Sequence, residues 1–251
     1  MKKLFLATIA VVALAAGSAG AADIRAPVYK APPIPYYDWS GCFVGVSGGG
    51  AWGRSKHVSG GPGGPGLDIT NSYNLSGGII GGTWGCNYRL GHGVIFGTES
   101  DFSWTNKQGS ANDIPPFAAG AVSGTKEHWL STSRVRLGAT PTDRVLLYVT
   151  GGLATARVEA TLNFPGVGVF SDTRNRWGWT AGVGGEYALG NRWSVKAEYL
   201  YVGFTDRDYF NPSPAAGVNV RSNVPLNDHI FRVGVNYNFG CLFLCGLFAK
   251  Y

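Results

Sequence analysis

Hydrophobic and polar residues alternate along much of the chain, and the stretch "VIFGTESDFSW" that begins at Val94 shows the pattern clearly. Read with a period of two, Phe96 and Trp104 share the face of Val94, whereas Glu99 and Asp101 share the opposite face. A strand of this kind separates two media. Either its apolar face packs against a soluble core and the acids meet water, or the apolar face meets lipid and the acids point into a barrel.

Eight such runs follow Trp39, and the lengths of their connections alternate. We expect strands over residues 42–52, 73–88, 94–105, 125–139, 144–157, 176–187, 192–205 and 228–239. The links after the second, fourth and sixth runs are the tight turns "RLGHG", "TPTD" and "ALGN", whereas the other links are long and rich in Gly, Pro, Ser, Asn and Asp. Outer-membrane barrels combine short periplasmic turns with long external loops. The pattern therefore predicts an all-β fold, an eight-stranded antiparallel up-and-down transmembrane β-barrel.

Charged residues within the runs lie on the faces opposite to the aromatic and branched side chains. They are Glu99, Asp101, Arg134, Arg136, Glu186, Lys196, Glu198 and Arg232. A narrow barrel in lipid needs small residues and mutually neutralising charges inside, whereas a soluble periplasmic barrel of the lipocalin or avidin type needs charges outside. Trp and Tyr crowd toward the strand ends, as in the girdles of a lipid-facing surface. We therefore assign the eight charges to the lumen, as structural salt bridges or, alternatively, as a selectivity or proton path.

Composition and targeting signals agree with an exported membrane barrel. Only 14% of the residues are charged, against roughly 25% in soluble proteins. The first residues, "MKKLFLATIAVVALAAGSAGA", are typical of a signal peptide over residues 1–21, and no later apolar stretch is long enough for a spanning helix. We expect a Pro- and Tyr-rich periplasmic linker over 22–38, the barrel over 39–239 and a tail over 240–251. The formal charge of +6 includes Lys2 and Lys3 and forms no basic cluster, so we expect no nucleic-acid partner.

The four cysteines all lie in the exported part of the chain, where disulfides are permitted. Cys42 opens the first run and Cys86 closes the second, so both lie near the short-turn end. We favour a bridge between them, with Cys241–Cys245 as its complement; the alternative is reduced thiols packed as small hydrophobic side chains. No histidine lies near Cys241 and Cys245 and no Cys-x-x-Cys pair occurs, so we expect no metal site.

Several longer segments carry a family resemblance. They are "YDWSGCFVGVSGGGAWG", "FGTESDFSW", "STSRVRLGATPTDRVLLYVTGGLA", "WGWTAGVGGEYALGNRWSVKAEYLYV" and "FRVGVNYNFG". From about Tyr37 to Phe239 the chain resembles the small rhizobial-type (alphaproteobacterial) outer-membrane β-barrel family of porin-like surface proteins, similar in architecture to the membrane domain of OmpA. The resemblance implies Sec-type export, an integral place in a Gram-negative outer membrane, a periplasmic amino terminus and insertion by the barrel assembly machinery.

The chain departs from the family pattern after Phe239. Members commonly end at an aromatic residue that closes the last strand, whereas here "GCLFLCGLFAKY" follows. Either Tyr251 ends a longer strand or the tail folds back at the periplasmic rim. We favour the second, because Gly240 and Gly246 interrupt the run.

The family includes reported hemin binders, so the resemblance implies hemin as a possible cofactor at the external side. Imidazole and phenolate groups are suitable axial ligands, and the candidates are His57, His128, His229, Tyr73 and Tyr209. We expect no enzyme and no other cofactor. Although His57 lies close to Ser55 and Ser59, it belongs to a Gly- and Pro-rich stretch that fixes no catalytic geometry, and we expect it in a surface loop.

These observations predict a structural and interaction protein of the outer membrane. It would contribute to envelope integrity and present its loops to lipopolysaccharide or external partners, with membrane lipid around it and a homo-oligomer as a possibility. The first alternative is a narrow porin-like channel, although an eight-stranded lumen is only wide enough for its own side chains. The second alternative is a hemin-binding surface protein.

Overall fold

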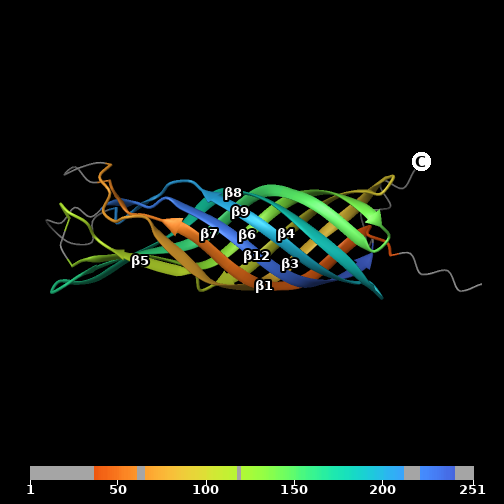
Figure 1. The fold of residues 1–251 in the computed structure, drawn as a ribbon, viewed down its shortest axis with the longest axis horizontal. Helices are drawn as coiled ribbons and strands as arrows, with labels where there is room; N and C mark the ends of the chain where they lie inside the picture. Colours follow the sequence, from red (N-terminus) through yellow and green to blue (C-terminus); the bar gives the residue numbers. More distant parts are fainter. Residues whose placement is uncertain (1–36, 61–65, 118–119, 212–220, 241–251) are drawn as a thin grey trace, which may run out of the picture. The chain divides into compact units, whose positions relative to one another are not determined.

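Antiparallel strands make up most of the part of the chain that the computed structural model describes, residues 37–60, 66–117, 120–211 and 221–240 (Figure 1). The strands are β1 (Gly41–Ser55), β2 (Val58–Ser59), β3 (Tyr73–Gly91), β4 (Val94–Thr105), β5 (Gln108–Asn112), β6 (Val122–Thr142), β7 (Val145–Phe164), β8 (Gly168–Gly190), β9 (Trp193–Phe204), β10 (Asp208–Tyr209), β11 (Ser222–Asn223) and β12 (Leu226–Gly240). Among these residues, no helix is long and apolar enough to cross a membrane.

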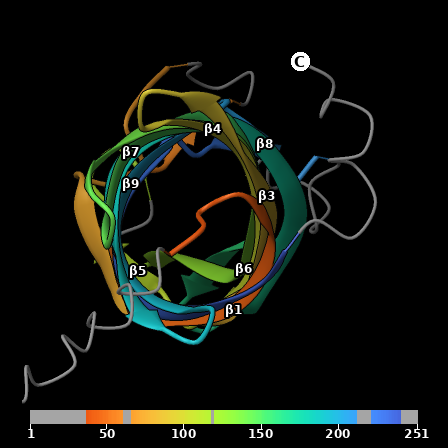
Figure 2. The ribbon, with the colours of Figure 1, turned by 90° about the vertical axis from the view of Figure 1, so that its right-hand side faces the viewer.

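The long strands close into a ring. The order is β1-β12-β9-β8-β7-β6-β4-β3, every neighbouring pair is antiparallel, and β3 pairs back with β1. β5 continues the ring beyond β4 and pairs with both β3 and β6. Figure 2 shows the ring from the short-turn end. In the described residues, the predicted eight-stranded up-and-down barrel is confirmed.

The outward face of the ring carries a band of exposed apolar side chains. Val46 on β1 and Leu153 on β7 keep 65% and 63% of their surface exposed. A water-soluble protein rarely exposes so extended an apolar surface, whereas a lipid-facing barrel requires one.

Aromatic side chains edge this band at the loop end. Trp52 on β1 stacks on His229 of β12 with ring centroids 6.3 Å apart, His229 lies 5.2 Å from Tyr201 of β9, and Tyr201 lies 5.3 Å from Trp179 of β8. This contact chain crosses four neighbouring strands. It is the girdle that amphipathic rings form at a membrane interface.

The outward positions of β7 change in character after Leu153. Up to this residue they carry exposed apolar side chains, Leu147, Val149 and Leu153, whereas the inward positions from Ala154 to Leu162 carry buried apolar side chains. The outward positions then carry polar residues such as Arg157 and Glu159. The exterior of the barrel therefore changes from lipid to water at this point, and the outer part of the barrel stands clear of the bilayer.

Several strands are consequently longer than the alternation predicted. β7 ends at Phe164 rather than at Arg157, and β8 begins at Gly168 rather than at Arg176. Residues 165–167 alone separate them, so the long loop expected at this place is wrong. The expectation ended each strand where the lipid-facing pattern ended, whereas backbone pairing continues into water with the pattern inverted.

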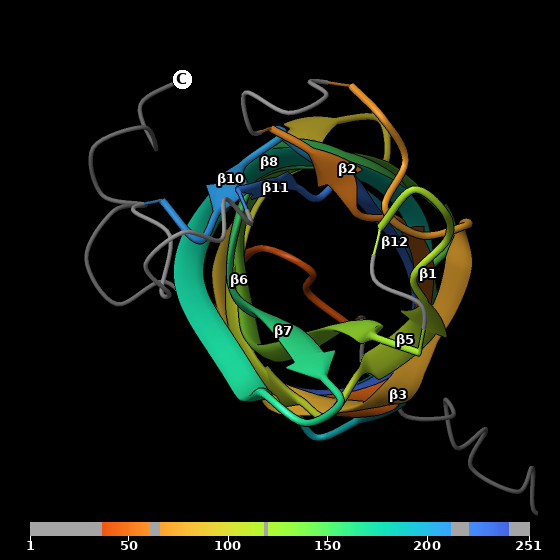
Figure 3. The same ribbon diagram turned by 90° about the vertical axis from the view of Figure 1, so that its left-hand side faces the viewer.

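Short strands at the loop end make a second sheet in the order β10-β11-β2 (Figure 3). Ser222 pairs with Ser59 of β2 and with Tyr209 of β10. The sheet therefore joins β2 to two segments from much later in the sequence, β10 and β11, and the three together form what we call the cap. Residues 61–65, within the Gly- and Pro-rich stretch, lie outside the described residues.

Two apolar clusters occupy the interior of the barrel. The cluster near the short-turn end contains Trp39, Ile95, Leu146, Tyr148 and Ala188. The larger cluster, toward the loop end, includes Leu130, Leu200, Ile230 and the inward residues of outer β7. The predicted lumen charges lie between them.

The first described residues plug the short-turn end (Figure 2). Trp39 is buried, and its Nε1 donates to the carbonyl oxygen of Asp143 at 3.1 Å. Tyr37 packs on Trp39 with ring centroids 4.6 Å apart, and the carbonyl oxygen of Asp38 accepts from Asn238 at 3.2 Å. Tyr37 and Asp38, expected in the linker, thus contact the barrel.

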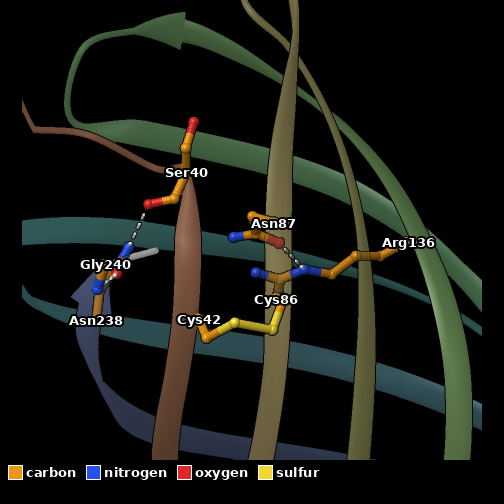
Figure 4. Close-up of a disulfide and its surroundings, with 7 residues drawn as sticks. All are labelled: Ser40, Cys42, Cys86, Asn87, Arg136, Asn238 and Gly240. Atoms are coloured by element: carbon orange, nitrogen blue, oxygen red, sulfur yellow. Dashed lines mark hydrogen bonds between the residues drawn. A yellow bond between two sulfur atoms is a disulfide. The ribbon is translucent and has the colours of Figure 1, made fainter. Parts of the chain in front are cut away.

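Cys42 and Cys86 lie opposite each other in the β1–β3 ladder and form a disulfide, which confirms the favoured pairing (Figure 4). Their Cα atoms are 3.9 Å apart. The other neighbour of Cys42 is Gly240, at the end of β12. The bridge therefore lies next to the seam at which the first and last strands close the barrel. Cys241, Cys245 and the tail lie outside the described residues.

We expect loss of this disulfide to lower the free energy of unfolding by about 4 kcal/mol, because the bridge closes a loop with a sequence separation of 44 in the unfolded chain. Urea titration of the mature Cys42→Ser protein in detergent micelles, followed by the gel-mobility shift of the folded barrel, measures this loss. The matched control replaces both Cys241 and Cys245 by serine. An equal loss in the control would contradict the assignment.

Candidate functional site

Charged side chains meet inside the barrel and form what we call the lumen network. Its members are Glu99, Asp101, Arg134, Arg136, Glu186, Lys196, Glu198 and Arg232, each at most 4% exposed. They come from β4, β6, β8, β9 and β12. The structure thus places inside the ring all eight residues that the alternation assigned to the lumen.

Arg134 lies at the centre of the network. It faces Glu99 in the β4–β6 ladder, and its Nη2 lies 2.7 Å from Glu99 Oε1 and 3.0 Å from Asp101 Oδ2. Its Nη1 crosses the lumen to Glu198 Oε2 on β9, at 2.9 Å. One guanidinium therefore holds carboxylates from two sides of the barrel, for which its planar fork of donors is well suited.

Arg232 completes a closed quartet of alternating charges. It faces Glu198 in the β12–β9 ladder, with Nε 2.6 Å from Glu198 Oε1. Its Nη1 and Nη2 lie 3.0 Å and 2.8 Å from the two carboxylate oxygens of Asp101 on β4. Asp101, Arg134, Glu198 and Arg232 are thus joined in a ring of ion pairs that connects opposite walls of the barrel.

The remaining members extend the quartet toward the short turns. Arg136 Nη1 lies 2.9 Å from Glu99 Oε2 and 2.7 Å from Glu186 Oε1, and its Nε donates to Asn87 Oδ1 at 2.8 Å (Figure 4). Lys196 Nζ lies 2.7 Å from Glu99 Oε1. Glu99 therefore accepts from three cations, and every charge of the network has an opposite partner.

Apolar layers lie on both sides of the network. The guanidinium carbon of Arg136 lies 4.6 Å from the ring centroid of Phe43 and 5.0 Å from that of Tyr148. On the loop side, Leu200 and Ile230 occupy the inward positions next to Glu198 and Arg232. The charges are therefore sealed from water, so their mutual pairing is what offsets the cost of burying them.

A second buried ion cluster lies nearer the loop end. Lys107 Nζ lies 3.0 Å from Glu127 Oε2 and also pairs with Asp228 Oδ2, and all three side chains are at most 1% exposed. A Cβ added at Gly53 would lie 2.7 Å from Asp228 Oδ1, so the absence of a side chain at this glycine makes room for the cluster.

The sequence alternation missed this cluster for identifiable reasons. A register shift between Glu127 and Trp129 turns Glu127 inward, although simple alternation places both residues on one face. Lys107 lies in a link between runs. Asp228 was detectable, because it shares the inward parity of Arg232 at the start of the expected last strand.

The structure contradicts the expectation that His57 lies in a surface loop. His57 is 0% exposed. Its Nε2 lies 3.3 Å from Thr125 Oγ1 and its Nδ1 lies 3.3 Å from Ser222 Oγ, and its ring stacks on Tyr73 at 6.2 Å. The sheet of β2, β10 and β11 explains the burial, because β2 follows His57 directly and packs the segment onto the barrel.

The hemin candidates are not brought together as a set. His57 and Tyr73 meet in the interior, but His128 and His229 are on the outward faces of β6 and β12. His128 Nε2 lies 2.8 Å from Glu159 Oε2, and His229 Nδ1 lies 2.6 Å from the Tyr199 hydroxyl.

Tyr209, the last hemin candidate, is fully buried in the cluster toward the loop end. In the described ranges, no group of three or more His, Cys, Asp or Glu side chains is arranged to hold a metal ion.

Comparison with known proteins identifies the family to which this architecture corresponds. The family described as outer membrane protein beta-barrel domain matches residues 7–239. The chain is 36% identical to the 31 kDa outer-membrane immunogenic protein of Brucella melitensis, over 95% of this chain and 100% of that protein. It is 27% identical to a 22 kDa outer membrane protein of Rhizobium leguminosarum, over 72% and 71% of the two chains. Among solved structures, OprG of Pseudomonas aeruginosa aligns with a TM-score of 0.47 at 15% identity, over 79% and 97% of the two chains.

We expect Glu99→Ala to lower the free energy of unfolding by roughly 3–5 kcal/mol, because three buried cations lose the carboxylate they share. The matched control is Glu159→Ala, which breaks a half-exposed pair with His128 and should cost less than about 1 kcal/mol. Urea titrations of both variants in the same micelles measure the difference. Equal losses of unfolding free energy in the two variants would show that the lumen network stabilises the barrel no more than a surface ion pair does.

We expect His57 to make the barrel acid-sensitive. Burial lowers the pKa of His57 from 6.5 to about 4, so between these values the unfolded chain binds a proton that the folded chain does not. The stability contributed by neutral His57 is complete above pH 6.5 and falls by up to about 3 kcal/mol as the pH drops to 4. The difference in unfolding free energy between wild type and His57→Gln, followed from pH 7 to pH 4, measures this contribution. Parallel curves would contradict it.

Proposed function

The chain belongs to the outer membrane protein β-barrel family, and we propose that it serves the outer membrane as a structural and interaction protein. In this role the barrel anchors a folded outer cap and contributes to envelope integrity, rather than conducting solutes. The family and the outer-membrane location are shared with the immunogenic proteins of Brucella that the chain matches over nearly all of its length.

The sealed lumen network is the observation that supports this role most directly. A water-filled channel needs a continuous path, whereas here the charged middle of the lumen is closed by ion pairs and followed by apolar side chains in both directions. Conduction through this interior would require the quartet to break, leaving buried charges without partners.

Other roles receive less support from the arrangement. A hemin iron needs an accessible axial ligand, yet His57 and Tyr73 are both buried and both hydrogen-bonded to Thr125. A serine hydrolase needs a histidine oriented by a third group. The partners of His57 are hydroxyls of Thr125 and Ser222 within a closed interior, which argues against catalysis at this position.

We extend the proposal to partners at the two ends of the barrel. The cap at the loop end faces outward and meets lipopolysaccharide, while the barrel assembly machinery receives the chain from the periplasm. Both assignments rest on the alternation of short turns and long connections, which in this class of barrel distinguishes the periplasmic from the external end.

We expect the purified mature protein to give no steady unitary conductance in planar lipid bilayers. The matched variant carries Arg134→Ala together with Glu198→Ala, which removes one cation and one anion of the quartet without changing the net charge. Brief conductance steps in this variant, with a silent wild type, would support a lumen closed by the network. Stable, ion-selective steps in the wild type would replace the proposal by the narrow channel.

Envelope integrity is tested in the bacterium that encodes the chain. Cells lacking the protein should leak periplasmic enzymes and become sensitive to detergent, and wild-type protein that is silent in bilayers should restore both properties. Unchanged leakage and detergent resistance in cells without the protein would contradict the structural role.

A further inference from the structure

A polar cavity opens at the loop end between the outer part of β8 and the cap strands β10 and β11. Figure 3 shows the ribbon of these strands from the loop end. Its volume is about 380 Å³, and it is lined by Arg174, Asp206, Arg207, Asp208, Asn211 and Asn223. All the described residues that line it are polar, and none of them belongs to the lumen network or to the aromatic girdle. Binding here would depend on hydrogen bonds rather than on apolar contact.

Arg174 is held in place by Asp172, which does not line the cavity. Its Nε lies 3.0 Å and 3.1 Å from the two carboxylate oxygens of Asp172, and its Nη2 lies 3.0 Å from Asp172 Oδ2. The same Asp172 Oδ2 accepts from the backbone N–H of Phe210 at 2.7 Å. The guanidinium is therefore fixed between β8 and the segment that follows β10.

Asp208, another residue that lines the cavity, is held in a similar way. It pairs with Asn223 in the β10–β11 ladder, and its carboxylate accepts from Asn223 Nδ2 at 3.3 Å and from Arg221 Nε at 3.0 Å. The hydrogen bonds from Arg221 hold the pKa of Asp208 below its usual range, so this acceptor is charged at neutral pH. Polar groups that are oriented before binding lose little entropy when a ligand arrives.

The charges that line the cavity balance. Arg174 and Arg207 are matched by Asp206 and Asp208, so an anion would approach two carboxylates and a cation would approach two guanidinium groups. A neutral ligand with many hydroxyl groups suits such a wall, because each hydroxyl both donates to carboxylates and accepts from guanidinium and amide groups. The volume lies within the range of small-molecule sites.

We propose that this cavity binds a neutral saccharide unit. The proposal names a class of ligand for the interaction role of the cap. It rests on the proposed function in one respect, namely that the loop end of the barrel faces outward. The saccharide has two sources, the sugars of the surrounding lipopolysaccharide or soluble glycans outside the cell, which share the same hydroxyl chemistry.

The test uses the full mature chain in detergent micelles and saturation-transfer NMR. The probes are the neutral disaccharides maltose, lactose and trehalose, together with inorganic phosphate. We expect saturable binding of at least one disaccharide, and none of phosphate. Asp206→Ala and Asn223→Ala should each weaken disaccharide binding by about tenfold, the effect of losing one hydrogen bond to a charged or oriented partner.

The matched control is Lys56→Ala, which removes an exposed ion pair with Asp68 at the same end of the barrel but outside the cavity. It should leave binding unchanged, and the heat-modifiable gel shift verifies that each variant is folded. Absence of saturable binding by all three disaccharides, tighter binding of phosphate, or an equal loss in Lys56→Ala would overturn the proposal. These outcomes are independent of bilayer conductance, so failure of the saccharide proposal and failure of the proposed non-conducting function can be told apart.

A second arm distinguishes the sources of the sugar. The protein is placed in phospholipid vesicles with and without lipopolysaccharide, and the apparent affinity for the disaccharide that binds is compared. A weaker apparent affinity with lipopolysaccharide supports occupancy by sugars of the membrane itself. An unchanged affinity supports a soluble glycan as the ligand of the same cavity.

Discussion

The ion pairs of Arg134 with carboxylates on two walls of the lumen are the interaction on which the rest of the barrel depends. An eight-stranded ring in lipid must fill its own interior, and any charge placed there needs a partner because water is absent. Arg134, Asp101, Glu198 and Arg232 satisfy this need as a closed quartet. Since the quartet joins β4 and β6 to β9 and β12, it also fixes how opposite walls face each other, which backbone pairing between neighbours does not do.

The same strands pass through two different media, lipid and then water, along their length. Within the bilayer the barrel is apolar outside and holds the lumen network inside, whereas beyond Leu153 the outward positions of β7 are polar and its inward positions are apolar. The strands can continue through this change of polarity, because the backbone N–H and C=O groups of neighbouring strands hydrogen-bond to each other in lipid and in water alike. The outer part of the barrel is therefore built like a soluble β-barrel, with a core that can hold β2, β10 and β11 against it.

The sequence carried enough information to predict the ring, the eight lumen charges and the disulfide, because all three follow from the two-residue period and from connection lengths. It did not reveal Glu127, since a single register shift beside Trp129 reverses the parity on which the prediction relied. The burial of His57 was also unpredictable, because it depends on pairing between Ser59 and Ser222, which are distant in the sequence. Local periodicity determines facing within one strand, whereas bulges and long-range pairing between short strands leave no periodic trace.

The division of the interior into layers separates stability from recognition. The lumen network lies away from the cap, so the side chains of the outer cavity can vary without exposing its charges. His57 is the exception, because it lies where the cap meets the barrel and hydrogen-bonds to both Ser222 of β11 and Thr125 of β6. Protonation there would add an unpaired buried charge at a junction between the cap and the barrel. The position of the outer surface thus depends on a neutral imidazole, while the membrane part of the barrel depends on charges that stay paired.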